Sequence, residues 1–320
     1  MLGEQLGRAA VDLRTPGGPS AEVIHQIRRR IKRSRSLLRL AQADLGASVA
    51  RHANAELRSV GAALATQRDA DALVETVDRL SASEPAGDAA PAREPVPEPD
   101  PSPELLASLA VVRAVLVERA QVVRAGPAAD RATLLGAAMT LERLVRWLDR
   151  VPSRADGWAA LGPGMARQHR RGRRAYRHLG DHPTAERLHE WRKRVKDLWY
   201  QERLLRRLWP EAQRPVIQAA DHLAGLLGFD HDLALLVDLL EGGVEVPQAG
   251  DVTDDPIAHV DADDRARVAA AATERRQNLQ VRAHRLGALL YADPAEAWQE
   301  RHGAWWDAAV VDPASDGVTA

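Results

Sequence analysis

A histidine followed by arginine and lysine at helical spacing occurs twice in this chain, and the two copies are 164 residues apart. Residues 24–32 read Ile-His-Gln-Ile-Arg-Arg-Arg-Ile-Lys, and residues 188–196 read Leu-His-Glu-Trp-Arg-Lys-Arg-Val-Lys. Guanidinium and ammonium groups bind phosphate oxygens through charge-assisted hydrogen bonds. A duplicated ladder of such groups therefore indicates one extended anionic ligand that is held from two sides.

The ladder of the first copy occupies one face of a predicted helix. At about 100° per residue, the basic and apolar side chains separate into two sectors. The basic sector carries His25, Arg28, Lys32, Arg35 and Arg39, and the apolar sector carries Ile24, Ile27, Ile31, Leu38, Ala41 and Leu45. The helix is therefore expected to bury its apolar sector and to present a concentrated cationic face.

The second copy repeats this arrangement with one exchange. Its basic sector carries His189, Arg192, Lys196, Trp199 and Arg203, while Glu202 falls on the apolar side. Trp199 stands where Arg35 stood, and its indole could stack on an arginine or fill a gap. The preceding helix adds a third basic stripe, consisting of Arg167, Arg170, Arg171, Arg174 and Arg177. Only residues 180–183 separate these two helices, which predicts antiparallel neighbours.

Charge is strongly segregated although the net charge is −1. Residues 25–39 carry seven Arg or Lys and no Asp or Glu, and residues 165–214 carry fifteen basic residues against six acidic ones. Like charges one turn apart destabilise a helix by a few tenths of a kcal/mol per pair. A solvated face is normally interleaved with Glu, so the uncompensated ladder favours an anionic partner.

Composition predicts a globular, all-α protein. Of the 320 residues, 45% are hydrophobic, and none is cysteine, which excludes disulfides and thiolate metal sites. No apolar run reaches 18 residues and no secretory signal is visible, so we expect a cytoplasmic protein without a membrane span. Period-two alternation is absent, whereas helical patterns are expected at 2–14, 20–45, 47–62, 68–80, 104–124, 128–150, 164–179, 184–208, 211–227, 230–241, 262–291 and 294–307.

A second duplicated element follows each ladder, at residues 65–69 and 228–232. Asp69 and Asp232 suit the first turn of a helix, where a carboxylate complements the helix dipole. They could instead orient a ladder arginine or the histidines. His25 and His189 could themselves donate an imidazole N–H to phosphate, or bond to backbone or to a buried carboxylate at the helix start.

The two His-x-x-Arg-x-x-x-Lys ladders and the element after each resemble the CHAD family, the conserved-histidine α-helical domain. The ending is also similar, with Leu286-Gly287 and Trp305-Trp306. The chain departs from the family pattern at Trp199, at Thr66 in place of a glycine, and in a proline-rich acidic linker at 81–103.

The resemblance implies two four-helix bundles, related by a pseudo-two-fold axis, over residues 1–308. The first repeat would span 1–150 and the second 164–308, with 309–320 as a flexible tail. It implies binding of inorganic polyphosphate in a basic groove and association with polyphosphate granules. The implied ligand residues, together with neighbours on the predicted basic faces, are His25, Arg28, Arg29, Lys32, Arg35, Arg39, Arg170, Arg171, Arg174, His189, Arg192, Lys193, Lys196 and Arg203.

Two other functions remain open at this point. Arginine-rich helices suit a nucleic-acid backbone, but the ladders lack the Asn and Gln side chains that read bases. A metal-assisted phosphohydrolase would need a carboxylate cluster beside the basic face. The acidic run at 251–264 lacks the glycine and glutamate placement of a calcium loop, and cationic neighbours oppose metal binding at His25 and His189. We therefore expect no catalytic residue, no metal site and no cofactor, and a protein that is not an enzyme.

Overall fold

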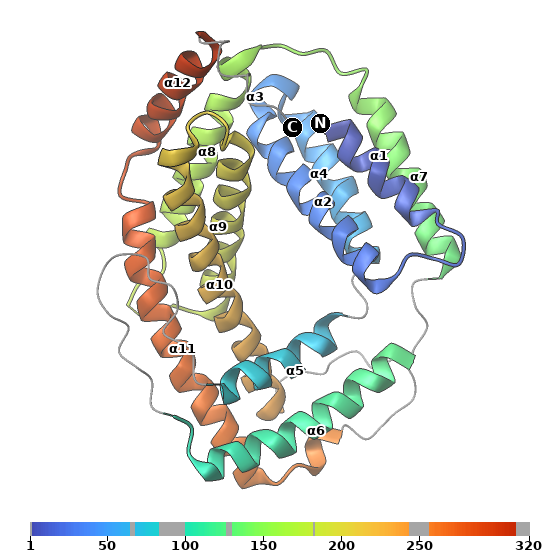
Figure 1. Cartoon of the computed structure of the whole chain (residues 1–320), viewed down its shortest axis with the longest axis vertical. Coiled ribbons are helices and arrows are strands. Elements are labelled where there is room, and N and C mark those ends of the chain that lie inside the picture. Colours follow the sequence, from blue (N-terminus) through green and yellow to red (C-terminus); the bar gives the residue numbers. More distant parts are fainter. Residues whose placement is uncertain are drawn as a thin grey trace. The chain divides into compact units, whose positions relative to one another are not determined.

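The structure is a computed structural model that describes residues 2–64, 68–82, 100–125, 130–181, 183–242 and 256–311. Within these ranges the chain is helical and contains no strand (Figure 1), which confirms the all-α prediction. Most of the predicted linker at 81–103, residues 243–255 of the acidic loop and residues 312–320 of the predicted tail lie outside the described residues.

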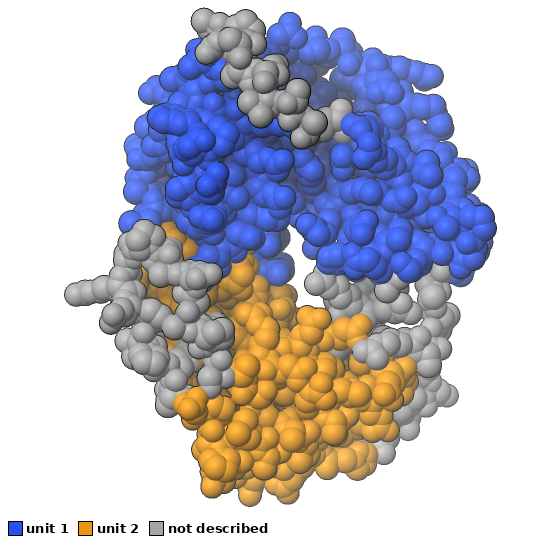
Figure 2. All heavy atoms as spheres, in the orientation of Figure 1, with its two compact units in different colours: residues 1–65, 129–222, 287–320 blue, residues 66–128, 223–286 orange. Residues whose placement is uncertain are grey.

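The chain packs as two compact units (Figure 2). Unit 1 comprises residues 1–65, 129–222 and 287–320, and unit 2 comprises residues 66–128 and 223–286. The helices that lie within unit 1 are α1 (Leu2–Leu13), α2 (Ala21–Leu40), α3 (Gln42–Leu45), α4 (Ala47–Ala63), α7 (Arg131–Leu148), α8 (Gly157–Arg177), α9 (Ala185–Leu205) and α12 (Ala295–Val311). Those within unit 2 are α5 (Arg68–Ser81), α6 (Pro103–Ala125) and the short η1 (Pro256–His259). Two long helices, α10 (Pro210–Leu240) and α11 (Ala262–Leu290), contribute residues to both units.

Each unit therefore combines segments from both predicted sequence repeats. The division by packing is not the division into 1–150 and 164–308, and the internal duplication of bundles stays a prediction. Locally, however, the two ladder helices begin in the same way. The Ser20 hydroxyl accepts a hydrogen bond from the Val23 N–H, and the Thr184 hydroxyl accepts one from the Arg187 N–H, each at 3.3 Å. These hydroxyls satisfy helix-start donors that have no partner within the helix.

The apolar sector of α2 is buried, as predicted. Ile27, Ile31 and Leu38 are at most 2% exposed, in a core that α1, α2, α4 and α7 share. Ile24 and Leu45 pack against this core from its edge. Since full burial of such a side chain contributes about 1.5–3 kcal/mol, this face fixes the rotation of α2 and hence the direction of its basic face.

Unit 2 has a core of its own. It is built from α5, α6, η1, the second part of α10 and the first part of α11, through residues such as Val77, Leu109, Leu236, Ile257 and Val268. None of the ladder residues belongs to this unit.

Four predictions about element ends were wrong. The helix expected at 20–45 is divided into α2 and α3 at Ala41, whose φ of −80° and ψ of 12° depart from the α-helical range. The expected helices at 211–227 and 230–241 form the single helix α10, because buried leucines such as Leu227 and Leu233 continue the apolar face across Gly228. Asp232 therefore lies inside a helix rather than in a first turn. Its neighbour Asp230 is buried and accepts a hydrogen bond from Gln280 at 2.7 Å. Residues 309–311, predicted as tail, complete α12. Asp69 is the second residue of α5, which is a first-turn position.

Helix α8 approaches α2 through a glycine. A Cβ built on Gly164 would lie 1.7 Å from the carbonyl oxygen of Leu40, so only glycine fits at this position. Besides α2, helix α8 contacts α3, α9 and α12. The contact with α9 confirms that the two basic helices are neighbours, and the close approach at Gly164 brings both to the end of the α2 ladder.

Gly164→Ala is expected to lower the free energy of unfolding by about 1–3 kcal/mol, because backbone must move to admit the methyl group. Gly7→Ala on α1 is the matched control. A Cβ there meets nothing within 4 Å, and the same change should raise stability by about 0.5–1 kcal/mol. Chemical denaturation of both variants checks this, and equal effects would show that α8 and α2 are not in close contact.

The buried face of α8 carries an ionisable group. His169 is 2% exposed and stacks on Trp298 of α12, with ring centroids 4.7 Å apart. Burial lowers the pKa of His169 to about 4. In the unfolded chain a histidine titrates near its ordinary value of about 6.5. Between these two values the unfolded chain binds more protons than the folded protein.

Stability should therefore fall as the pH is lowered from about 6.5 to about 4, by at most about 1.4 kcal/mol per pH unit from this group. His169→Phe, which preserves an aromatic ring against Trp298, is expected to flatten this part of the profile. The measurement is the free energy of unfolding at several pH values for both proteins. An unchanged slope in the variant would show that His169 is not held neutral by burial.

Candidate anion-binding site

Three basic helices meet in unit 1. Helices α2, α8 and α9 each contact the other two, and α2 also contacts α4. Their apolar faces are directed into the cores, so their cationic faces are brought together rather than dispersed over the surface.

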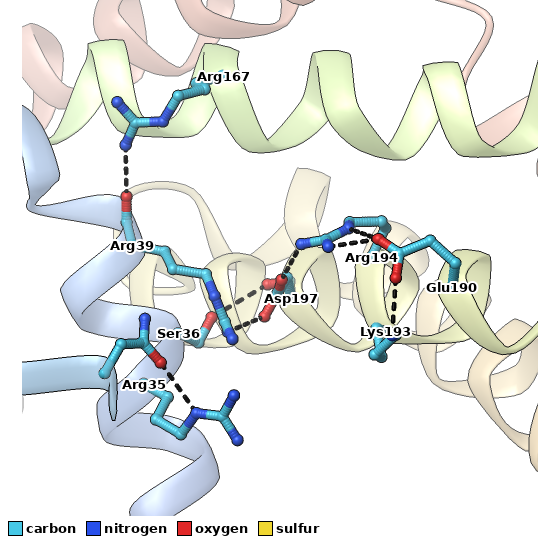
Figure 3. Close-up of polar contacts among 9 residues, drawn as sticks. Arg35, Ser36, Arg39, Arg167, Glu190, Lys193, Arg194 and Asp197 are labelled. Carbon is cyan, nitrogen blue, oxygen red and sulfur yellow. Dashed lines mark hydrogen bonds and ion pairs between the residues drawn. The ribbon is translucent and has the colours of Figure 1, made fainter. Parts of the chain in front are cut away.

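A buried carboxylate lies where these helices meet. Asp197 of α9 is 6% exposed, and its Oδ1 pairs with Arg39 Nη1 of α2 at 2.6 Å (Figure 3). Its Oδ2 lies 3.5 Å from Arg194 Nη1, and its backbone carbonyl accepts a hydrogen bond from the Ser36 hydroxyl at 3.3 Å. Asp197 thus joins α2 to α9 through both its side chain and its backbone.

Further polar contacts extend this junction to α8 and along α9. Arg167 of α8 donates through Nη2 to the backbone carbonyl of Arg39 at 2.8 Å (Figure 3). On α9, Glu190 accepts from Arg194 Nε at 2.8 Å and pairs with Lys193 at 2.7 Å. The second carboxylate of the region is therefore already engaged by two cations.

The junction is crowded with positive charge. Burial raises the pKa of the Asp197 carboxyl, and the charges of Arg39, Arg194, Arg35 and Arg171 oppose this. Burial, followed by the charges of Arg39 and Arg58, lowers the pKa of the Arg35 guanidinium. Partial burial, followed by the charge of Arg194, lowers the pKa of the Arg171 guanidinium. Like charges thus lie close enough to disfavour one another.

The predicted stripe on α2 follows α4 for part of its length. Arg28 Nη1 donates to the carbonyl of Leu64 at 3.0 Å, and Arg35 Nε donates to Asn54 Oδ1 of α4 at 2.9 Å. Both arginines are half-buried. Their partners are neutral, so these hydrogen bonds hold the side chains in place without cancelling their charge.

A second cationic group lies earlier on α2 and later on α9. Burial raises the pKa of the Tyr200 phenol, and Arg29, Arg203 and Arg33 act in the opposite direction. The indole of Trp199 has Lys196 Nζ 5.0 Å and Arg203 Cζ 4.6 Å from its ring centroid, within cation–π range. This confirms that Trp199 stacks on an arginine. Burial lowers the pKa of Lys196, Asp221 opposes this shift, and Arg192 adds to it.

The predicted site residues are therefore distributed over distinct environments. Arg35, Arg39 and Arg171 meet around Asp197, while Arg29, Lys196 and Arg203 belong to the group at Trp199 and Tyr200. Arg170 is instead ion-paired with Glu296 of α12. The remaining members are half-buried or exposed on the same helices: His25, Arg28, Lys32, Arg174, His189, Arg192 and Lys193.

The prediction from sequence missed five members of the two groups. Arg194, Asp197 and Tyr200 lie on α9, and Arg33 lies on α2, all outside the predicted basic sectors of these helices. Arg58 comes from α4. Asp197 carried a usable signal, because it is the only acidic residue between Glu190 and Glu202. Arg58 carried none, since only the packing of α4 on α2 brings it near Arg35.

The described ranges contain neither a membrane-spanning helix nor a cluster of metal-ligating side chains. No helix there is long and apolar enough to cross a membrane. No group of three or more His, Cys, Asp or Glu side chains there is arranged to hold a metal ion.

Comparison with known proteins gives one match. The family model of the CHAD domain matches residues 5–241, which include both ladders and α10. No curated protein and no solved structure matches the chain.

Arg39→Gln is expected to lower the free energy of unfolding by about 1–3 kcal/mol, because it removes the shorter ion pair of a buried carboxylate while Arg194 remains. Arg8→Gln is the control. It removes an exposed pair with Glu4 on α1 and should cost about 0.5 kcal/mol or less. Urea denaturation of both variants compares them, and equal small effects would show that Asp197 does not depend on Arg39.

Proposed function

The chain belongs to the CHAD domain family, and from this premise we propose that it binds inorganic polyphosphate through the basic faces of α2, α8 and α9. The family assignment supports a polyphosphate-related role. The residues around Asp197 supply a physical reason for it.

The observation that carries the proposal is the imbalance of charge at the junction. Five guanidinium groups, those of Arg35, Arg39, Arg58, Arg171 and Arg194, lie around two carboxylates, Asp197 and Glu190. A guanidinium has five N–H donors. The hydrogen bonds of the junction use one donor of Arg35, one of Arg39 and three of Arg194. Phosphate oxygens would accept from the others and relieve the mutual repulsion of the arginines.

The extent of the basic surface favours a chain of phosphates over one small anion. Arg29, Arg33 and Arg39 recur along α2, where each turn advances about 5.4 Å. Arg203 and Lys196 lie beside the same contact on α9. Linked phosphates would bind successive groups in one event, so their affinity would exceed that of a single phosphate without any new kind of contact.

We propose in addition that binding is not accompanied by hydrolysis and that the protein associates with polyphosphate granules. The arginines of the junction are hydrogen-bond donors that stabilise negative charge. The accompanying measurement is release of orthophosphate from polyphosphate in the presence of Mg²⁺ or Mn²⁺. Release by the purified protein would replace the binding role with that of a phosphohydrolase.

The double variant Arg35→Gln/Arg171→Gln is expected to bind long-chain polyphosphate about tenfold or more weakly, because each arginine would supply a charge-assisted hydrogen bond. Affinity should also depend less steeply on salt, since fewer counterions are released. The fold should persist, because both arginines are crowded by other cations. Calorimetric titration at two salt concentrations measures both quantities.

The double variant Arg143→Gln/Arg146→Gln is the matched control, because it removes two exposed arginines from α7, a helix that packs on α1 and α4. Its affinity should equal that of the wild type. Equal losses in both proteins would mean that the net charge, not this surface, determines binding. Duplex DNA that displaces polyphosphate from the wild type would instead favour nucleic-acid binding.

A further inference from the structure

Helices α2 and α9 meet at two pairs of positions. Ser36 of α2 donates a hydrogen bond to the backbone carbonyl of Asp197 on α9. Arg33 lies earlier on α2, and its charge lowers the pKa of Tyr200, which lies later on α9. Arg33, Ser36 and Tyr200 also line one small cavity. The contact therefore places Ser36 against Asp197 and Arg33 close to Tyr200.

These two pairs occupy the same two positions of the sequence repeat. With the offset of 164 residues between the ladders, Asp197 corresponds to Arg33 and Tyr200 corresponds to Ser36. The two ends of the contact therefore use equivalent positions of the two ladders, but the charged residue at these positions is positive at one end and negative at the other. One end has an arginine at the position where the other end has a buried aspartate.

The aspartate occupies the centre of the arginine group at its end. Its two carboxylate oxygens face Arg39 and Arg194, and its side chain is 9% exposed. An anion that entered between these two arginines would have to displace a carboxylate that is held by its own helix. At the Arg33 end, the charges of Arg29, Arg203 and Arg33 affect the pKa of Tyr200 more strongly than any described carboxylate does.

We propose that Asp197 is a specificity-determining residue, a built-in counter-anion that closes the Arg39 and Arg194 end of the surface to single phosphate groups. A tethered carboxylate is present at a high effective concentration, and one orthophosphate displaces it poorly. A polyphosphate chain need not displace it, because the chain gains contacts with Arg35, Arg58, Arg171 and the Arg33 end. This inference rests on the proposed function for the identity of the ligand.

The experiment compares orthophosphate binding by the wild type, Asp197→Asn and Asp12→Asn at constant ionic strength. Asp12 of α1 pairs with Arg30 of α2, the helix that carries Arg39. Its replacement by Asn changes the net charge by the same amount as Asp197→Asn. Asp197→Asn should bind orthophosphate at least tenfold more tightly than the wild type, and millimolar orthophosphate should raise its Tm by several degrees. Asp12→Asn should respond as the wild type does.

Two results would overturn the inference: orthophosphate affinity of Asp197→Asn no higher than that of the wild type, or an equal gain in Asp12→Asn. If Asp197→Asn does not fold, Arg39→Gln is compared with Arg39→Gln/Asp197→Asn. This double variant removes opposite charges together and should bind orthophosphate more tightly than Arg39→Gln. Equal affinities would again reject the role of the carboxylate.

Titration of the wild type with long-chain polyphosphate separates this inference from the proposed function. If the wild type binds polyphosphate and no variant binds orthophosphate more tightly than the wild type does, only the role proposed for Asp197 is wrong. If the wild type does not bind polyphosphate but Asp197→Asn gains orthophosphate, the proposed function is wrong and the aspartate still closes an anion site.

Discussion

The pairing of one buried carboxylate with arginines from two helices is the interaction on which the basic surface depends. Helices α2, α8 and α9 all carry cations on the faces that they bring together, and without an anion these faces would repel. Asp197 binds Arg39 and Arg194, and its backbone accepts from Ser36, so α2 and α9 can pack closely. Asp197 and Glu190 are too few to neutralise the five arginines around them, and the remaining charge is available to a ligand.

Packing elsewhere in unit 1 keeps this surplus charge in place. The apolar face of α2 is buried with α1, α4 and α7, and Gly164 allows α8 to reach the backbone of Leu40. Neutral acceptors, the Leu64 carbonyl and the Asn54 amide, orient Arg28 and Arg35 without reducing their charge. The surface is therefore ordered before a ligand arrives, which lowers the entropic cost of binding.

Much of this could be predicted from the sequence, because helices and amphipathic faces follow from local periodicity. The start of α2 and α9 after Ser20 and Thr184, the burial of Ile27 and the stacking at Trp199 all depend on residues within a few turns. The continuous helix α10 was missed because the core outweighs Gly228. Arg58 and the role of Asp197 were missed because they depend on contacts between helices distant in sequence, which a helical wheel does not contain.

The most direct test of the central claim is to locate the bound chain on the protein. Arginines would be modified with phenylglyoxal in the presence and absence of long-chain polyphosphate, and the modification rate at each position would be measured by mass spectrometry. The account predicts that polyphosphate slows modification of Arg35, Arg58 and Arg171, while Arg8 and Arg146 react at unchanged rates. Unchanged rates at the first three positions, with protein that binds polyphosphate, would contradict it and place the ligand on another surface.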